Sequence, residues 1–171
     1  MKQKDKYIRP LMGIGSVLYT VIMLILLYGK GIRSHASRVM QSREIGYWVT
    51  VRRYTNFEPL KTILPFVRMM RWFALPDILT SQTVGNILIF IPCGIFLPYF
   101  LKKQRHFGSF FRTCLLLILF IEISQVLTFL GSFDIDDVIL NMIGCLLGYL
   151  LYSTCAGIMR CSRKAKKKRK A

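Results

Sequence analysis

The sequence predicts an all-α, polytopic membrane protein with four transmembrane helices and both termini in the cytoplasm. Three observations lead to this prediction. Apolar residues make up 53% of the 171-residue chain, which suits a lipid-embedded protein better than a soluble one. Four segments come close to the roughly 20 mostly apolar residues that a helix needs to cross the hydrocarbon core. The basic residues are also distributed unevenly among the connecting segments.

The chain length indicates a single domain covering residues 1–171. Its predicted spans cover residues 11–28, 83–101, 113–130 and 137–159. The second span contains Pro92 and Pro98, which membrane helices tolerate when neighbouring groups satisfy the freed carbonyls.

The first span has one alternative interpretation, a signal peptide cleaved near Ser34-His35-Ala36. Its apolar run is longer than the core of a usual signal peptide. Lys30 and Arg33 also lie between that run and the small-residue site. We therefore expect a transmembrane helix.

The net charge of +17 is concentrated in particular segments. Residues 1–10, 102–112 and 160–171 are rich in Lys and Arg, whereas residues 131–136 contain neither. Because short loops rich in Lys and Arg stay in the cytoplasm, the first three segments are predicted inside and the last outside. The 29–82 loop is then external although it is basic, since a long loop obeys the charge rule only weakly.

The basic tail at 160–171 is predicted to lie in the cytoplasm near anionic lipid headgroups. Such attraction is worth about 1 kcal/mol per basic residue close to the surface. The tail lacks the aromatic or motif context of a nucleic-acid site, so nucleic acid is not expected as a partner.

The 29–82 loop contains recognisable local patterns. Residues 47–51 are predicted to be extended, and Asn56 to Leu60 to form a turn, because the residue before Pro59 is pushed out of the helical region. Residues 66–75 suit either a segment in the membrane interface or a cap over the helices. Thr80 or Ser81 is expected to cap the second span.

The five cysteines give no sign of a metal site or a disulfide framework, because none has CxxC spacing. We interpret them as small apolar packing residues, and we expect no cofactor and no metal.

Six polar side chains lie in or at the edge of the apolar segments, where lipid disfavours them. A carboxyl or amide at membrane depth is costly and is a functional-site candidate by default. The predicted topology places all six toward the outer membrane face. The candidate ligand-binding residues are Asn86, Glu122, Gln125, Asp134, Asp137 and Asn141.

Helical spacing groups these residues. Glu122 and Gln125 are separated by three positions and share one helix face. In the fourth span, a single stripe is polar in its outer part and glycine in its inner part, and the glycines allow close helix packing. That stripe consists of Asp134, Asp137, Asn141, Gly144 and Gly148.

Structural interpretations compete with a binding site. Acidic residues at the start of the fourth span are favoured by the helix dipole. The amides could serve as hydrogen-bonding groups between helices, typically worth under about 2 kcal/mol. Glu122 is the residue least explained in this way, since its own span carries no basic residue near it.

Signals for enzymatic chemistry are sparse. His35 and His106 fall on opposite sides of the membrane in the predicted topology, and no Ser-His or Cys-His pairing in one site is evident. Asp134, Asp136 and Asp137 could hold Mg²⁺ or Ca²⁺, although acidic triplets are common at helix starts.

Three motifs resemble those of the VanZ-like family of small bacterial membrane proteins. They are Asn86-x-x-x-Phe90-x-Pro92-x-Gly94-x-x-Leu97-Pro98, Glu122-x-x-Gln125, and Asp134-x-x-Asp137-x-x-x-Asn141-x-x-Gly144-x-x-x-Gly148, with Asn56-Phe57-Glu58-Pro59 preceding them. Many members carry an arginine shortly before the first aspartate. Here Gly131-Ser132-Phe133 stands there instead, and Arg52 or Arg53 is the expected source of compensating charge.

The resemblance implies a protein of the bacterial plasma membrane and a link to resistance against teicoplanin-type lipoglycopeptides, without implying a reaction. We favour a non-enzymatic role: binding or masking a lipid headgroup, a lipid-linked cell-wall precursor or the antibiotic. The rival is an intramembrane, metal-assisted enzyme acting on a lipid-linked substrate, and a transporter is third.

Overall fold

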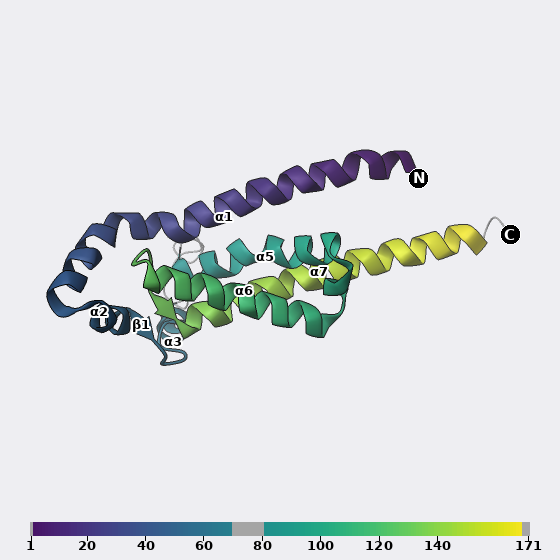
Figure 1. Cartoon of the computed structure of the whole chain (residues 1–171). Helices are drawn as coiled ribbons and strands as arrows, with labels where there is room; N and C mark the ends of the chain where they lie inside the picture. Colours follow the sequence, from purple (N-terminus) through teal and green to yellow (C-terminus); the bar gives the residue numbers. More distant parts are fainter. Residues whose placement is uncertain (1, 70–80, 169–171) are drawn as a thin grey trace. The chain divides into compact units, whose positions relative to one another are not determined.

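The computed structural model describes residues 2–69 and 81–168, and nearly all of them are helical, which confirms the predicted class (Figure 1). In chain order the elements are α1 (Lys2–Ile45), α2 (Tyr47–Arg53), β1 (Thr55–Asn56), α3 (Ile63–Met69), α5 (Gln82–Phe100), η1 (Lys102–Arg105), α6 (Phe107–Leu127), β2 (Phe133–Asp134) and α7 (Ile135–Lys168).

Four of these helices are long and apolar enough to cross a membrane, as predicted. The candidate spans are Arg9–Gly29, Gln82–Phe100, Phe107–Leu127 and Ile135–Met159. The third differs most from its predicted bounds of 113–130. It begins at Phe107, and it ends at Leu127 because Phe129 adopts a positive φ of 57°, which a right-handed helix cannot contain.

The chain forms two compact units. The first contains residues 1–58 and 119–135, and the second contains residues 59–118 and 136–171. Helix α6 therefore contributes its first half to the second unit and its last turns to the first.

In the first unit, α1 packs on the end of α6. The Tyr28 hydroxyl lies 2.5 Å from the Ser124 hydroxyl. A Cβ added at Gly31 would overlap the backbone of Leu130, so only glycine fits there. Helix α1 continues to Ile45, which corrects the prediction of a loop from residue 29.

Helix α2 shows that the prediction of an extended segment at residues 47–51 was wrong. Aromatic and β-branched residues favour strands only where the packing suits them. Here Tyr47 packs its ring 5.2 Å from that of Phe129 and donates its hydroxyl to the Leu127 carbonyl at 2.8 Å. Thr50 is fully buried, and its hydroxyl bonds the carbonyl of Gly46.

A short parallel ladder joins the two sequence segments of the first unit. Thr55 pairs with Phe133, and Asn56 pairs with Asp134. The predicted turn after Asn56 is confirmed, since the Asn56 side-chain oxygen accepts the Glu58 N–H at 3.2 Å. Asp134 therefore lies in a strand just before α7, and not in the helical stripe that the spacing predicted.

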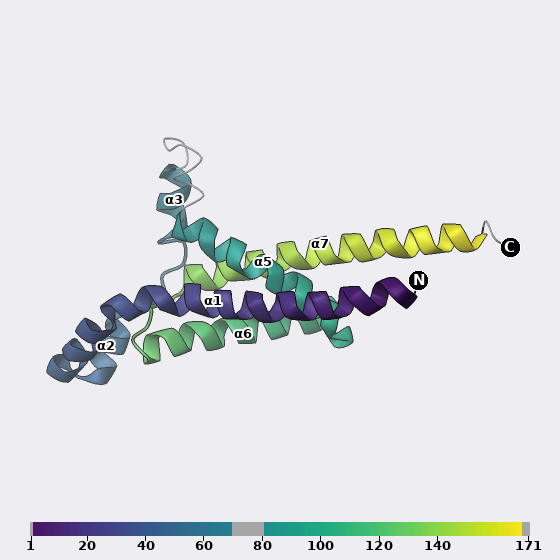
Figure 2. The ribbon, with the colours of Figure 1, turned by 90° about the horizontal axis from the view of Figure 1, so that it is seen from above.

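Within the second unit, α5 and α7 pack with their backbones close together (Figure 2). A Cβ at Gly144 would overlap the carbonyl oxygen of Ile87, and one at Gly148 would overlap that of Ile91. Gly94 of α5 meets α7 in the same way, against the carbonyl oxygen of Cys145. Small residues allow this approach, which maximises dispersion contacts where no hydrophobic effect operates.

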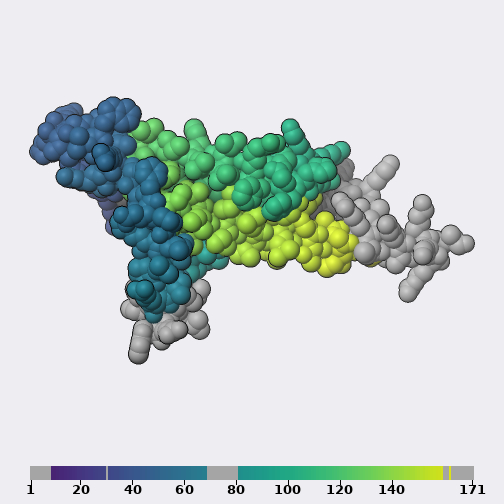
Figure 3. Space-filling view, turned by 90° about the horizontal axis from the view of Figure 1, so that it is seen from below, coloured from purple at the N-terminus to yellow at the C-terminus, as the bar shows by residue number. Residues whose placement is uncertain are grey.

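The ends of α5 and α6 are fixed by side chains of the same unit. Ser81 caps α5 by accepting the Val84 N–H, which confirms one of the two predicted caps; Thr80 and most of the predicted 66–75 segment lie outside the described residues. The Tyr149 ring packs 4.5 Å from that of Phe110, and its hydroxyl bonds the Arg105 carbonyl. The first half of α6 and α7 accordingly lie side by side (Figure 3).

Candidate functional site

The three aspartates at the start of α7 have different surroundings. Asp134 accepts a hydrogen bond from the Asn56 side-chain amide at 3.2 Å, within the first unit. The parallel ladder brings these two residues together, because they are partners in its register. Asp134 remains partly exposed.

Asp136 is fully buried and binds the backbone of the loop that precedes α3. Its carboxylate accepts the N–H groups of Leu60 at 2.6 Å, Thr62 at 2.7 Å and Ile63 at 3.1 Å. Leu60 has a positive φ of 66°, so this loop is tightly bent where the carboxylate holds it. The sequence had suggested a helix start or a cation site for Asp136, and not these backbone partners.

Asp137 pairs with the amide of the second span. The Asn86 side-chain N–H donates to an Asp137 carboxylate oxygen at 2.5 Å, within the second unit. Asn141 follows one turn later on the same face of α7 and is almost fully buried. Both Asn86 and Asp137 are partly exposed, whereas Asn141 is enclosed.

Glu122 and Gln125 lie on the last turns of α6, in the first unit. Glu122 is 2% exposed, and Gln125 is also buried. The Gln125 side-chain amide donates to the carbonyl of Leu27 in α1 at 2.8 Å. This bond ties α6 to α1 and gives Gln125 a structural role beside any role in binding.

The six predicted residues thus fall into two groups. Glu122, Gln125 and Asp134 belong to the first unit, and Asn86, Asp137 and Asn141 to the second. Glu122, Gln125 and Asn141 are buried. Asn86 and the two aspartates are partly exposed, and each aspartate accepts a hydrogen bond from an asparagine side chain. Carboxylate oxygens of this kind can accept hydrogen bonds from the hydroxyl, amide or ammonium donors of a polar headgroup.

Arg38 is a residue that sequence reasoning missed. Its guanidinium donates to the Gly131 carbonyl at 2.5 Å and stacks 4.3 Å above the Tyr54 ring centre. It thereby brings positive charge to the segment where the resemblance expects an arginine, whereas Arg52 and Arg53 are exposed. Helical spacing gives a signal for the position of Arg38. Gly31 and Arg38 are seven positions apart and share the face of α1 that packs on residues 130–131.

The chain is 39% identical to Protein VanZ from Enterococcus faecium over 71 residues, which are 42% of this chain and 44% of the relative. No solved structure matches the chain. A family model described as VanZ/LLP1 matches residues 16–158, which is most of the sequence. The chain is therefore a membrane protein that belongs to the VanZ/LLP1 family.

Proposed function

We propose that this chain is a multi-pass protein of the bacterial plasma membrane that binds or masks a component of the cell envelope. The ligand is a polar lipid headgroup, a lipid-linked cell-wall precursor or a teicoplanin-type lipoglycopeptide. Its candidate ligand-binding residues are the polar side chains described above, on the outward-facing side of each unit, and both termini lie in the cytoplasm. Family membership and the similarity to Protein VanZ support the link to teicoplanin resistance.

The observation that carries this proposal is the Asn86–Asp137 pair at the start of two apolar helices. Polar and ionisable groups in such segments are expensive and usually face a cavity or a partner group. The pair is partly exposed, and Asn141 extends it one turn deeper. A headgroup that offers hydroxyl or amide donors would find a carboxylate already oriented by a hydrogen bond.

The hydrogen bonds of the Asp136 carboxylate favour a binding function over the rival function, a metal-assisted enzyme. Metal ligation by the acidic triplet would draw on the oxygens of Asp134, Asp136 and Asp137. Asp136 already uses its carboxylate for three backbone N–H groups. Withdrawing the carboxylate from that loop would break three hydrogen bonds to a charged acceptor, each worth about 1.5–3 kcal/mol.

Mass spectrometry of co-purifying molecules tests the proposal. The wild-type protein, Glu122→Gln and Thr154→Val are expressed to equal levels and extracted in mild detergent. Thr154 serves as the control because its exposed hydroxyl bonds its own helix, at the carbonyl of Leu150. We expect wild type and Thr154→Val to carry the same envelope component and Glu122→Gln to lose most of it.

A matching loss of teicoplanin resistance with Glu122→Gln, unaffected by a chelator, would support binding. Equal ligand content in all three proteins would contradict the proposed site. Resistance that disappears on chelation at constant protein level would favour the enzyme instead.

A further inference from the structure

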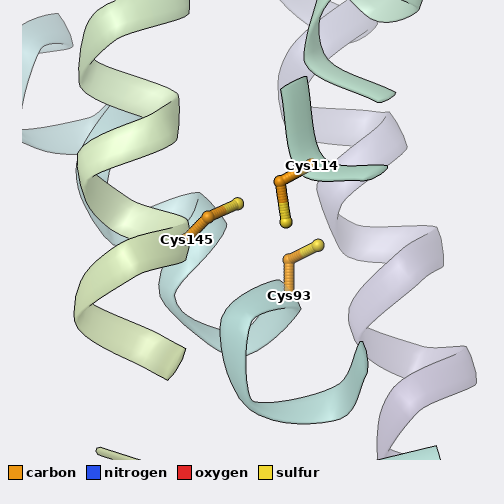
Figure 4. A group of neighbouring side chains, drawn as sticks. All are labelled: Cys93, Cys114 and Cys145. Atoms are coloured by element: carbon orange, nitrogen blue, oxygen red, sulfur yellow. The ribbon is translucent and has the colours of Figure 1, made fainter. Parts of the chain in front are cut away.

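Three cysteines that are far apart in the sequence meet inside the second unit (Figure 4). Cys93 comes from α5, Cys114 from α6 and Cys145 from α7. Their sulfur atoms all lie within 4.8 Å of one another, in the space between the three helices. Cys114 and Cys145 are fully buried, and Cys93 is 7% exposed.

We infer that these three thiols form a binding site for a single Cu(I) ion, which joins α5, α6 and α7. This site is separate from the polar residues of the proposed function. It could not be predicted from CxxC spacing, because each sulfur is contributed by a different helix.

The geometry suits three-coordinate sulfur ligation. A metal at the centre of a sulfur triangle, with metal–sulfur distances of about 2.3 Å, needs sulfur atoms about 4.0 Å apart. The observed spacing of up to 4.8 Å requires each pair to approach by less than about 1 Å. Side-chain rotation about χ1 can supply that movement without shifting the helices.

The donor set selects the metal. Sulfur-only ligation excludes Mg²⁺ and Ca²⁺, which take oxygen, and favours soft ions such as Cu(I) and Zn²⁺. Structural Zn²⁺ sites almost always have four protein ligands. Among the described residues, the group contains three cysteines and no His, Asp or Glu, so it matches an ion that accepts three ligands.

The surroundings keep water out. Phe90, Phe110 and Ile118 are each fully buried and lie one turn from Cys93 or Cys114 on the same helix faces. An apolar shell of this kind restricts solvent access to a metal site.

The three cysteines lie nearer the predicted cytoplasmic ends of their helices. Cys93 and Cys114 are each seven residues from the helix ends at Phe100 and Phe107, or about 10 Å. Tyr149, one turn after Cys145, bonds the η1 carbonyl of Arg105, so Cys145 lies at a similar depth. The cytoplasm is reducing and keeps such thiols available.

Binding conserves charge without any redox step. Copper enters and stays as Cu(I), two thiols release their protons to water, and the third remains a neutral thiol ligand. The complex then carries one net negative charge, and the basic residues Lys102, Lys103 and Arg105 lie in η1, which joins the nearer ends of α5 and α6.

The test uses the full chain in detergent under ascorbate, with Cu(I) supplied as its bicinchoninate complex. We expect one Cu(I) per chain, and X-ray absorption should report three sulfur ligands at about 2.3 Å. Cys93→Ser, Cys114→Ser and Cys145→Ser should each weaken binding at least tenfold. Cys155→Ser is the matched control, because this exposed α7 thiol lies outside the group, and it should bind like wild type.

Several results would overturn the inference. They are equal affinity in Cys145→Ser and wild type, fewer than three sulfur ligands in the wild-type spectrum, or Zn²⁺ binding as tightly as Cu(I). The wild-type spectrum remains decisive even if a serine variant fails to fold.

Discussion

At the scale of residues, sequence patterns found the polar side chains but not their partners. The cost of burying Asn86, Asp137 and Asn141 in lipid identifies them from sequence alone. The hydrogen bond between Asn86 and Asp137 could not be predicted in this way, because it depends on how α5 packs against α7. Asp136 was harder to predict, because its partners are backbone N–H groups, which have no signature in the sequence.

Asp136→Asn should destabilise the protein by about 3 kcal/mol. The substitution removes a charge that strengthens hydrogen bonds to three backbone donors, and each charged hydrogen bond is worth about 1.5–3 kcal/mol. Thermal unfolding in detergent, followed by circular dichroism, measures the loss. Asp134→Asn, which changes a partly exposed residue, is the control and should cost well under half as much. Equal melting temperatures for wild type and Asp136→Asn would refute this role.

At the scale of elements, hydrophobicity fixed the number of spans but not every boundary. The end of α6 depends on the positive φ of Phe129, which cannot be predicted by counting apolar residues. Helix α2 forms because Tyr47 and Thr50 find partners at the end of α6 and in their own turn, and this packing overrides strand propensity.

Gly144→Ala should reduce the yield and the melting temperature of the folded protein. The added Cβ overlaps the Ile87 carbonyl oxygen, so α5 and α7 must separate. Gly157→Ala is the matched control, because its Cβ would meet nothing within 4 Å on the same helix. Helix propensity alone favours alanine by about 1 kcal/mol, so this control should be neutral or stabilising. If both variants behave alike, the α5–α7 contact does not determine stability.

At the scale of the whole molecule, the charge distribution predicts the topology on which an external polar site depends. Cysteine introduced at Ser132 should react with a membrane-impermeant maleimide added to intact cells. Cysteine at Ser162 should react only after the membrane is permeabilised. The background carries Cys155→Ser and Cys161→Ser, which removes the thiols near the tail. Labelling of Ser162→Cys from outside would invert the arrangement and place the aspartates in the cytoplasm.

The central claim is that the polar side chains bind an envelope component without transforming it. The most direct measurement is equilibrium binding of a fluorescent lipid-linked cell-wall precursor to the protein in nanodiscs, with teicoplanin as a second probe. Wild type should bind one of these probes saturably, and Glu122→Gln should bind it at least about tenfold more weakly, the equivalent of about 1.4 kcal/mol. The probe should be recovered chemically unchanged, with or without EDTA. Equal binding by both proteins, or EDTA-sensitive conversion of the probe, would contradict the claim.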